Sequence, residues 1–116
     1  MTRIYHNPRC SKSRATLSLL EARGIEPEVV RYLETPPDAD TLRGITEALG
    51  CSMGDLMRRG ETLYRELGIA GGNHDEDALI RLVVDHPVLL ERPIVVHDGR
   101  AVVGRPPENV LALFDR

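Results

Sequence analysis

The sequence contains no tryptophan, one phenylalanine and three tyrosines, so its hydrophobic core must be built mainly from aliphatic side chains. With 116 residues, 41% of them hydrophobic, the chain is long enough for one domain and too short for two. No apolar stretch approaches the roughly 20 residues that cross a bilayer, and the N-terminus lacks the apolar segment of a signal peptide. We therefore expect no membrane segment and a cytoplasmic location.

Cysteine is also scarce, since the chain has only two, which excludes a disulfide-dense secreted scaffold and favours a reducing compartment. Its four histidines are scattered and show no metal-ligand spacing, and no phosphate loop or dinucleotide fingerprint is present. The net charge of −3 argues against non-specific binding of nucleic acid. We expect no metal, no bound cofactor and no nucleic-acid partner.

Hydrophobic spacing and turn residues predict an α/β protein with the element order β-α-β, a helical stretch, then α-β-β-α. The first expected elements are a strand at 3–5, a helix at 11–23, a strand at 28–32, a helix ending at Gly50, and short helices through Met57 and at 61–67. They are followed by a helix from the acids at 75–77 to Pro87, strands at 94–97 and 100–103 around Asp98-Gly99, and a last helix from Pro106. The buried side of the helix after the acids is expected to include Leu79, Leu82 and Val83.

This element order matches a thioredoxin-like fold with a four-stranded mixed sheet, the alternative being another α/β two-layer sandwich. We expect residues 1–116 to form a single domain with a helical insertion at about 38–72.

Positive charge gathers around Cys10, because Arg3, Arg9, Lys12 and Arg14 all precede the first acidic residue of the chain. Cys10 lies where a predicted strand gives way to the N-terminus of a predicted helix. The free N–H groups there stabilise a thiolate and can hold a small oxyanion beside it. The sequence therefore predicts a nucleophilic cysteine; the alternative is a small buried hydrophobic residue.

The segment Cys10-Ser11-Lys12-Ser13 has serine where dithiol oxidoreductases carry their second cysteine. Ser13 can hydrogen-bond a thiolate but cannot form a disulfide, so a reductive cycle needs another thiol. Cys51 has no basic neighbours and is expected to be a structural thiol, which makes an external thiol such as glutathione the simpler inference. A phosphatase-like Cys-x5-Arg loop is excluded, because Thr16 stands where the arginine is required.

Five segments together carry a family resemblance, and they follow one another in order along nearly the whole chain: 5–14 (YHNPRCSKSR), 32–37 (YLETPP), 66–68 (ELG), 86–96 (HPVLLERPIVV) and 104–107 (GRPP). They resemble the glutaredoxin-coupled arsenate reductases, in particular their chromosomal, YfgD-like branch. The resemblance implies a thioredoxin-like fold and the reduction of arsenate to arsenite. In the implied cycle the Cys10 thiolate attacks arsenate, glutathione adds, and glutaredoxin resolves the mixed disulfide.

The resemblance also implies which residues form the site. Arg58, Arg92 and Arg105 would gather the oxyanion, as guanidinium groups match its geometry and neutralise its charge. Arg59 is an ambiguous neighbour of Arg58. The resemblance further implies a cis peptide between Arg92 and Pro93.

The resemblance implies that His6 tunes the thiol, and the hydroxyl group of Ser13 is expected to support the thiolate by a hydrogen bond. For His6, an ordinary loop side chain is an equally good interpretation.

Two other functions stay open from the sequence. The first is a regulator of the Spx type, which shares the fold and binds RNA polymerase; its usual C-x-x-C switch is absent here, because Ser13 replaces the second cysteine. The second is a thiol reductase acting on another small electrophile or on a protein mixed disulfide.

Overall fold

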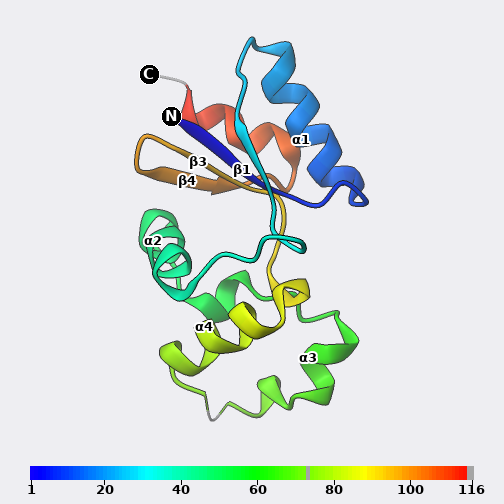
Figure 1. Ribbon diagram of the computed structural model, residues 1–116, viewed down its shortest axis with the longest axis vertical. Helices are drawn as coiled ribbons and strands as arrows, with labels where there is room; N and C mark the ends of the chain where they lie inside the picture. Colours follow the sequence, from blue (N-terminus) through cyan, green and yellow to red (C-terminus); the bar gives the residue numbers. More distant parts are fainter. Residues whose placement is uncertain (73, 115–116) are drawn as a thin grey trace. The chain divides into compact units, whose positions relative to one another are not determined.

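In the computed structural model, which describes residues 1–72 and 74–114, four strands form one mixed sheet in the order β2-β1-β3-β4 (Figure 1). The strands are β1 (Thr2–His6), β2 (Glu28–Arg31), β3 (Ile94–His97) and β4 (Arg100–Val103). β1 pairs in parallel with β2 and antiparallel with β3, and β3 pairs antiparallel with β4. The predicted four-stranded mixed sheet is confirmed, with β2 at one edge.

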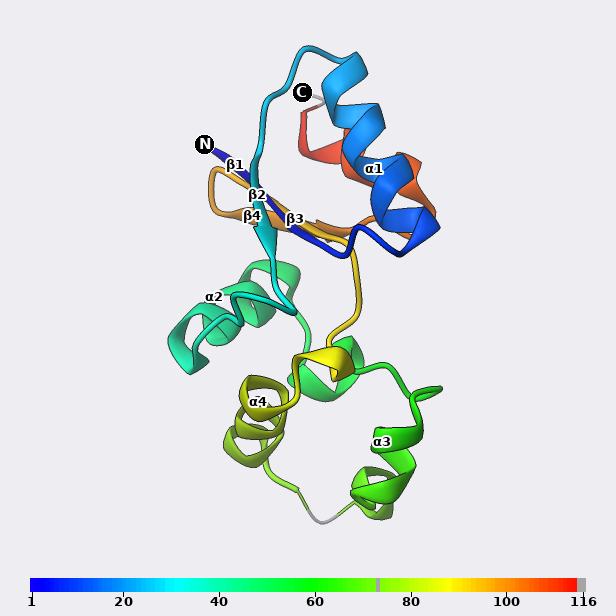
Figure 2. The ribbon, with the colours of Figure 1, turned by 45° about the vertical axis from the view of Figure 1, so that its right-hand side comes forward.

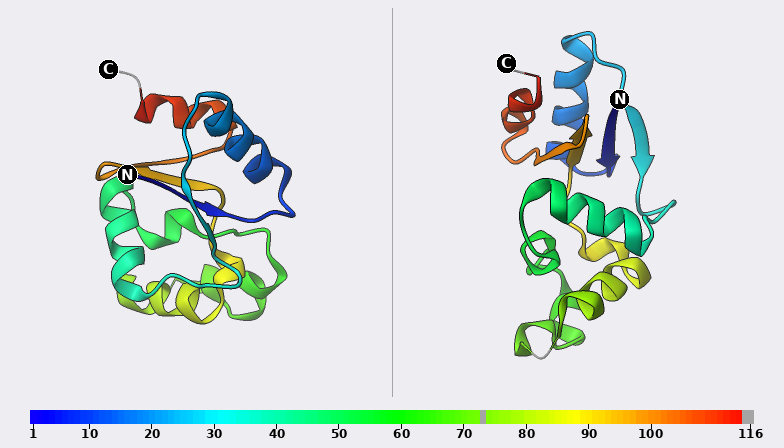
Figure 3. Two further views of the ribbon diagram at one scale, coloured as in Figure 1. Left: turned by 45° about the horizontal axis from the view of Figure 1, so that its top comes forward. Right: turned by 90° about the vertical axis from the view of Figure 1, so that its left-hand side faces the viewer.

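Helix α1 (Ser11–Ala22) and the 3-10 helix η4 (Pro107–Leu113) cover the same face of this sheet, as both views of Figure 3 show. The core between them is aliphatic, as the composition predicts; its buried members are Ile4, Leu20, Val95, Val110 and Leu113. Ile4 and Val95 are register partners on adjacent strands, so they point to the same face. The last element begins where expected, but as a 3-10 helix.

The hairpin between β3 and β4 turns on two residues with positive φ, Asp98 at 49° and Gly99 at 81°. Positive φ at both central positions is the geometry of a type I′ turn, which suits the twist of paired strands. The prediction of a two-residue hairpin is confirmed.

The chain forms two compact units, of which the sheet and its two covering helices are the first: Met1–Thr35 and the chain from Arg92 onward. The second unit, Pro36–Glu91, is helical and contains α2 (Ala39–Leu49), η1 (Met53–Leu56), α3 (Thr62–Glu66), η2 (Ile69–Gly71), α4 (Glu76–Asp85) and η3 (Pro87–Leu89). Among the described residues, no helix is long and apolar enough to span a membrane. The single domain over 1–116 stays a prediction.

Carboxylate caps begin the two longer helices of the second unit. Asp38 Oδ1 accepts a hydrogen bond from the Thr41 N–H at 2.8 Å, and Asp75 Oδ1 accepts one from the Ala78 N–H at 2.8 Å. Each cap satisfies a backbone donor that the first turn of a helix leaves unpaired.

The buried side of α4 differs in part from the prediction. Ile80 and Val83 are buried, whereas Leu79 and Leu82 are half-buried. Residues 80 and 83 have the same i, i+3 spacing as residues 79 and 82, so the spacing alone does not predict which pair is buried. The missed residue is Ile80, which is 1% exposed.

Gly104 lies in a tight contact between the end of β4 and helix α1. A Cβ atom at this position would be 2.7 Å from Thr16 Oγ1 and 2.9 Å from Pro93 Cγ, closer than real Cβ contacts. The Gly104 N–H donates to the Pro93 carbonyl oxygen at 2.9 Å. The absence of a side chain therefore lets the backbone at 104 pack against both Thr16 and Pro93.

We expect Gly104→Ala to destabilise the protein by about 1–3 kcal/mol, because the added methyl group overpacks this contact. Gly44→Ala is the matched control: Gly44 lies in α2 with no atom within 4 Å of the added Cβ, and the change should stabilise slightly. Urea denaturation of both variants measures the difference. Equal stability of the two variants would contradict the interpretation of the Gly104 contact.

Candidate active site

Cys10 is the N-cap residue of α1, at the end of the loop that leaves β1 (Figure 2). Its φ and ψ are −95° and 123°, its carbonyl oxygen accepts the first helical hydrogen bond from the Arg14 N–H, and its own N–H donates to the Asn7 carbonyl. The side chain makes no capping hydrogen bond and is 9% exposed. The predicted position at a helix start is confirmed, and the buried side chain has no competing capping role.

Ser13 connects the first turn of α1 to the residues before Cys10. Its hydroxyl oxygen lies 2.7 Å from His6 Nδ1 and accepts a hydrogen bond from the Asn7 N–H at 3.0 Å. Both His6 and Ser13 are buried, Ser13 completely. The sequence predicts that Ser13 and His6 tune the thiolate; in the structure their hydrogen bonds hold the loop that ends at Cys10.

The imidazole of His6 is held in its neutral form. Burial lowers the pKa of His6 below its ordinary value, and the positive charges of Arg31 and Arg14 lower it further. A neutral imidazole offers no positive charge to a nearby thiolate. His6 is therefore suited to positioning Ser13 rather than to electrostatic stabilisation of sulfur.

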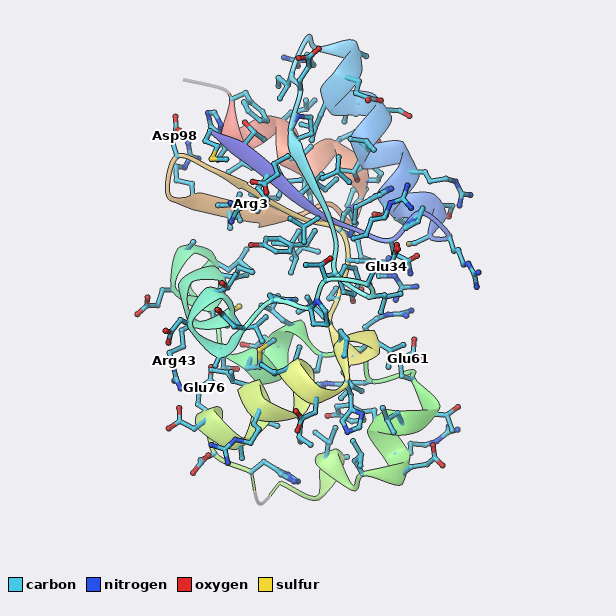
Figure 4. All side chains as sticks on the ribbon, viewed as in Figure 1. Arg3, Glu34, Arg43, Glu61, Glu76 and Asp98 are labelled. Atoms are coloured by element: carbon cyan, nitrogen blue, oxygen red, sulfur yellow. The ribbon has the colours of Figure 1, made fainter. Side chains whose placement is uncertain are left out.

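The cations counted around Cys10 are not all available to it. The guanidinium of Arg3, on β1 (Figure 4), is paired with Glu28 on β2, with both Arg3 Nε and a terminal nitrogen 2.9 Å from Glu28 Oε1. Arg14 donates to the Pro8 carbonyl oxygen at 3.0 Å, so its side chain folds back over the loop. Local positive charge at the site therefore comes from fewer residues than the sequence suggests.

Arg92 and Arg105 belong to the same unit as Cys10, and each precedes a cis proline. The cis peptide at Arg92-Pro93 is confirmed; a second one at Arg105-Pro106 was not predicted. Arg105 donates from a guanidinium nitrogen to the Arg92 carbonyl oxygen at 3.3 Å. Gly104, the neighbour of Arg105, packs against both Thr16 of α1 and Pro93, the neighbour of Arg92.

Arg58 lies in the second unit, where it is half-buried and fixed by two carboxylates. A terminal nitrogen forms an ion pair with Glu61, and Nε lies 3.7 Å from Glu91 Oε1. Its backbone N–H donates to the Leu89 carbonyl at 2.7 Å, next to the β-bridge between residues 57 and 90. Its neighbour Arg59 is exposed.

Neither Glu61 nor Glu91, the two carboxylates beside Arg58, was predicted to be part of the site. Glu61 stands three residues after Arg58, a spacing that signals an ion pair within one turn, whereas Glu91 is distant in sequence and gives no such signal.

Cys51 also lies in the second unit and is half-buried. Burial raises the pKa of the Cys51 thiol, and the carboxylates of Asp55 and Glu76 raise it further, which disfavours a thiolate. These surroundings suit a structural thiol. Among the residues that the structure describes, no group of three His, Cys, Asp or Glu side chains is placed to hold a metal ion.

The four-stranded mixed sheet, with α1 and η4 covering one face, defines a protein of the thioredoxin-like class, with Cys10 at the start of its first helix. A family model described as the ArsC family matches residues 5–113, and the chain belongs to this family.

Several proteins are similar to the chain over nearly its full length. The chain is 59% identical to the uncharacterized protein YfgD of Escherichia coli K12, over 96% of this chain and 94% of that protein. It is 58% identical to an arsenate reductase of Neisseria meningitidis, over 97% of each chain. A solved structure of a putative arsenate reductase from Yersinia pestis matches with a TM-score of 0.94 and 50% identity, over 97% of this chain and 99% of that one.

We expect Ser13→Ala to destabilise the protein by about 1–3 kcal/mol, because it leaves the half-buried Asn7 N–H without its acceptor and the buried His6 without its partner. Ser18→Ala is the matched control, since Ser18 lies on the exposed side of the same helix. Thermal denaturation of both variants provides the measurement. A Ser13 variant as stable as the Ser18 variant would show that these hydrogen bonds contribute little.

Proposed function

We propose that this protein reduces arsenate to arsenite through a covalent adduct on Cys10. The observation that carries the proposal is the position of Cys10, a helix N-cap with no capping hydrogen bond, in the same unit as Arg92 and Arg105. The names of the relatives at 58% identity and of the similar solved structure support arsenate as the substrate.

The proposed first step is attack of the Cys10 thiolate on arsenic. At neutral pH arsenate, like phosphate, carries between one and about two negative charges, so an anionic sulfur approaches it only if cations neutralise it. We assign this role to the guanidinium groups of Arg92 and Arg105 and to the N–H groups at the start of α1. A sulfur–arsenic bond forms and one arsenate oxygen leaves as water after protonation. Arg58, which the resemblance adds to this set, stays a prediction.

The second step needs another thiol, because one cysteine supplies only half of a disulfide. We propose glutathione as this thiol. Its sulfur bonds to Cys10 Sγ, the sulfur–arsenic bond breaks, and the electron pair of that bond passes to arsenic, which leaves as arsenite. Cys10 and glutathione are then joined in a mixed disulfide, which a dithiol protein such as glutaredoxin reduces.

The raised pKa of Cys51 and the hydrogen-bonded serine at position 13 support an external thiol over an internal one. All electrons in this scheme come from thiols, so we propose no bound cofactor and a reducing, cytoplasmic setting.

We expect Cys10→Ser to abolish arsenate-dependent NADPH consumption in an assay with glutathione, glutaredoxin and glutathione reductase. Cys51→Ser is the control and should retain most activity. Turnover by the native protein no faster than that of Cys10→Ser would refute the proposal. Glutathionylation of Cys10 without arsenate turnover would point instead to another electrophilic substrate.

We expect Arg105→Ala to lower kcat/KM for arsenate by about 100-fold, the usual effect of removing one donor to a developing anion. Alkylation of Cys10 by a neutral reagent such as iodoacetamide should change far less, because that reaction has no anion to bind. Arg23→Ala, an exposed arginine at the far end of α1, controls for net charge. Equal losses in both reactions would mean that Arg105 supports the fold.

A further inference from the structure

A groove lies beside the loop that leads to Cys10, and the reaction described above leaves it without a role. Two adjoining depressions share His6, Arg31 and Glu34 in their walls. One depression continues along β2 to Val29, and the other along the loop at 7–9, which ends at Cys10. We call the two together the β2 groove. All its lining residues belong to the first unit.

Two opposite charges lie in the middle of the β2 groove. Arg31 and Glu34 form a loose ion pair, with 3.7 Å between a guanidinium nitrogen and Glu34 Oε2, and their side chains are 60% and 67% exposed. Figure 4 shows Glu34 beyond the carboxyl end of β2. An exposed pair of this kind contributes little to stability, so a ligand can separate it at small cost. A ligand carrying both a carboxylate and an ammonium group would satisfy both side chains.

The walls of the groove suit an extended peptide with a short apolar part. Val29 and Leu33 are 42% and 43% exposed, which makes them unusual among the large hydrophobic residues of the described chain. β2 is an edge strand, so its outer backbone groups can pair with an added chain segment. Arg9, at the loop end of the groove, supplies a second positive charge.

The position of the groove relates it to the second step of the reaction. Its loop wall, 7–9, is followed directly in the chain by Cys10, the residue that would carry the adduct. An external thiol is required because Ser13 replaces a second cysteine in the helix. Glutathione has the matching charges: two carboxylates, one ammonium group and a net charge of about −1 at neutral pH.

We propose that the β2 groove is the binding site for the thiol reductant, with Arg31 bound to a peptide carboxylate and Glu34 to the peptide ammonium group. The proposal rests on the proposed function for the identity of the step and adds the location and chemistry of the reductant site. The bond changes are those already given: the sulfur–sulfur bond forms as the sulfur–arsenic bond breaks.

The test uses S-methylglutathione, which keeps all charges of glutathione but cannot react, and the Cys10→Ser protein. Titration followed by two-dimensional 1H–15N NMR should shift the amide signals of His6, Asn7 and Arg9 and of residues 29–35. Arg31→Ala and Glu34→Ala should each weaken binding about five- to tenfold, the loss expected for one exposed charge-assisted contact. Arg43→Ala is the matched control, because it removes an exposed ion pair with Asp77 in the other unit.

The proposal is overturned if S-methylglutathione does not bind at millimolar concentration, shifts signals elsewhere only, or binds Arg31→Ala and the control equally well. The exchange of both charges, Arg31→Glu with Glu34→Arg, should restore part of the affinity if the pair recognises a zwitterion. Because no arsenate is present, this binding is measured independently of turnover. In the coupled assay, Arg31→Ala should raise KM for glutathione, whereas Arg43→Ala should leave it unchanged.

Discussion

Gly104 lies where a Cβ atom would collide with Thr16 Oγ1 and Pro93 Cγ, and the arrangement of the site follows from this contact. The packing holds the segment after β4 against α1 and against Pro93, in the segment before β3. Arg105 and Arg92 belong to these two segments, and a hydrogen bond joins them directly. The arginines are thus placed by backbone packing, which is stiffer than the long side chains themselves.

Several of the positive charges that the sequence places near the site are neutralised in the structure. Glu28 neutralises Arg3, and two carboxylates of the second unit neutralise much of the charge of Arg58. Burial and the nearby cations lower the pKa of His6, which favours its neutral form. Positive charge therefore remains on Arg9, on Lys12 and Arg14 of α1, and on the arginine–proline segments, while the protein is acidic overall.

Local signals made most of the fold predictable from sequence. Asp98-Gly99 requires a turn with positive φ, Asp38 caps a helix, and the spacing of aliphatic residues gives the helix and strand ranges. The pairing of His6 with Ser13 and the role of Gly104 were not predictable, because they depend on contacts that only the folded chain creates. The cation count around Cys10 was too high for the same reason, since Arg3 meets Glu28 only through the register of β1 and β2.

The hydrogen bonds of Ser13 have a consequence for the evolution of related thiol enzymes. A single Ser13→Cys exchange would place a second sulfur where dithiol enzymes have one, yet it would also remove the oxygen that His6 and Asn7 require. A thiol is a much weaker acceptor than a hydroxyl group, and position 13 is fully buried. A cysteine at position 13 would therefore weaken the loop that ends at Cys10 unless position 6 or 7 changed with it.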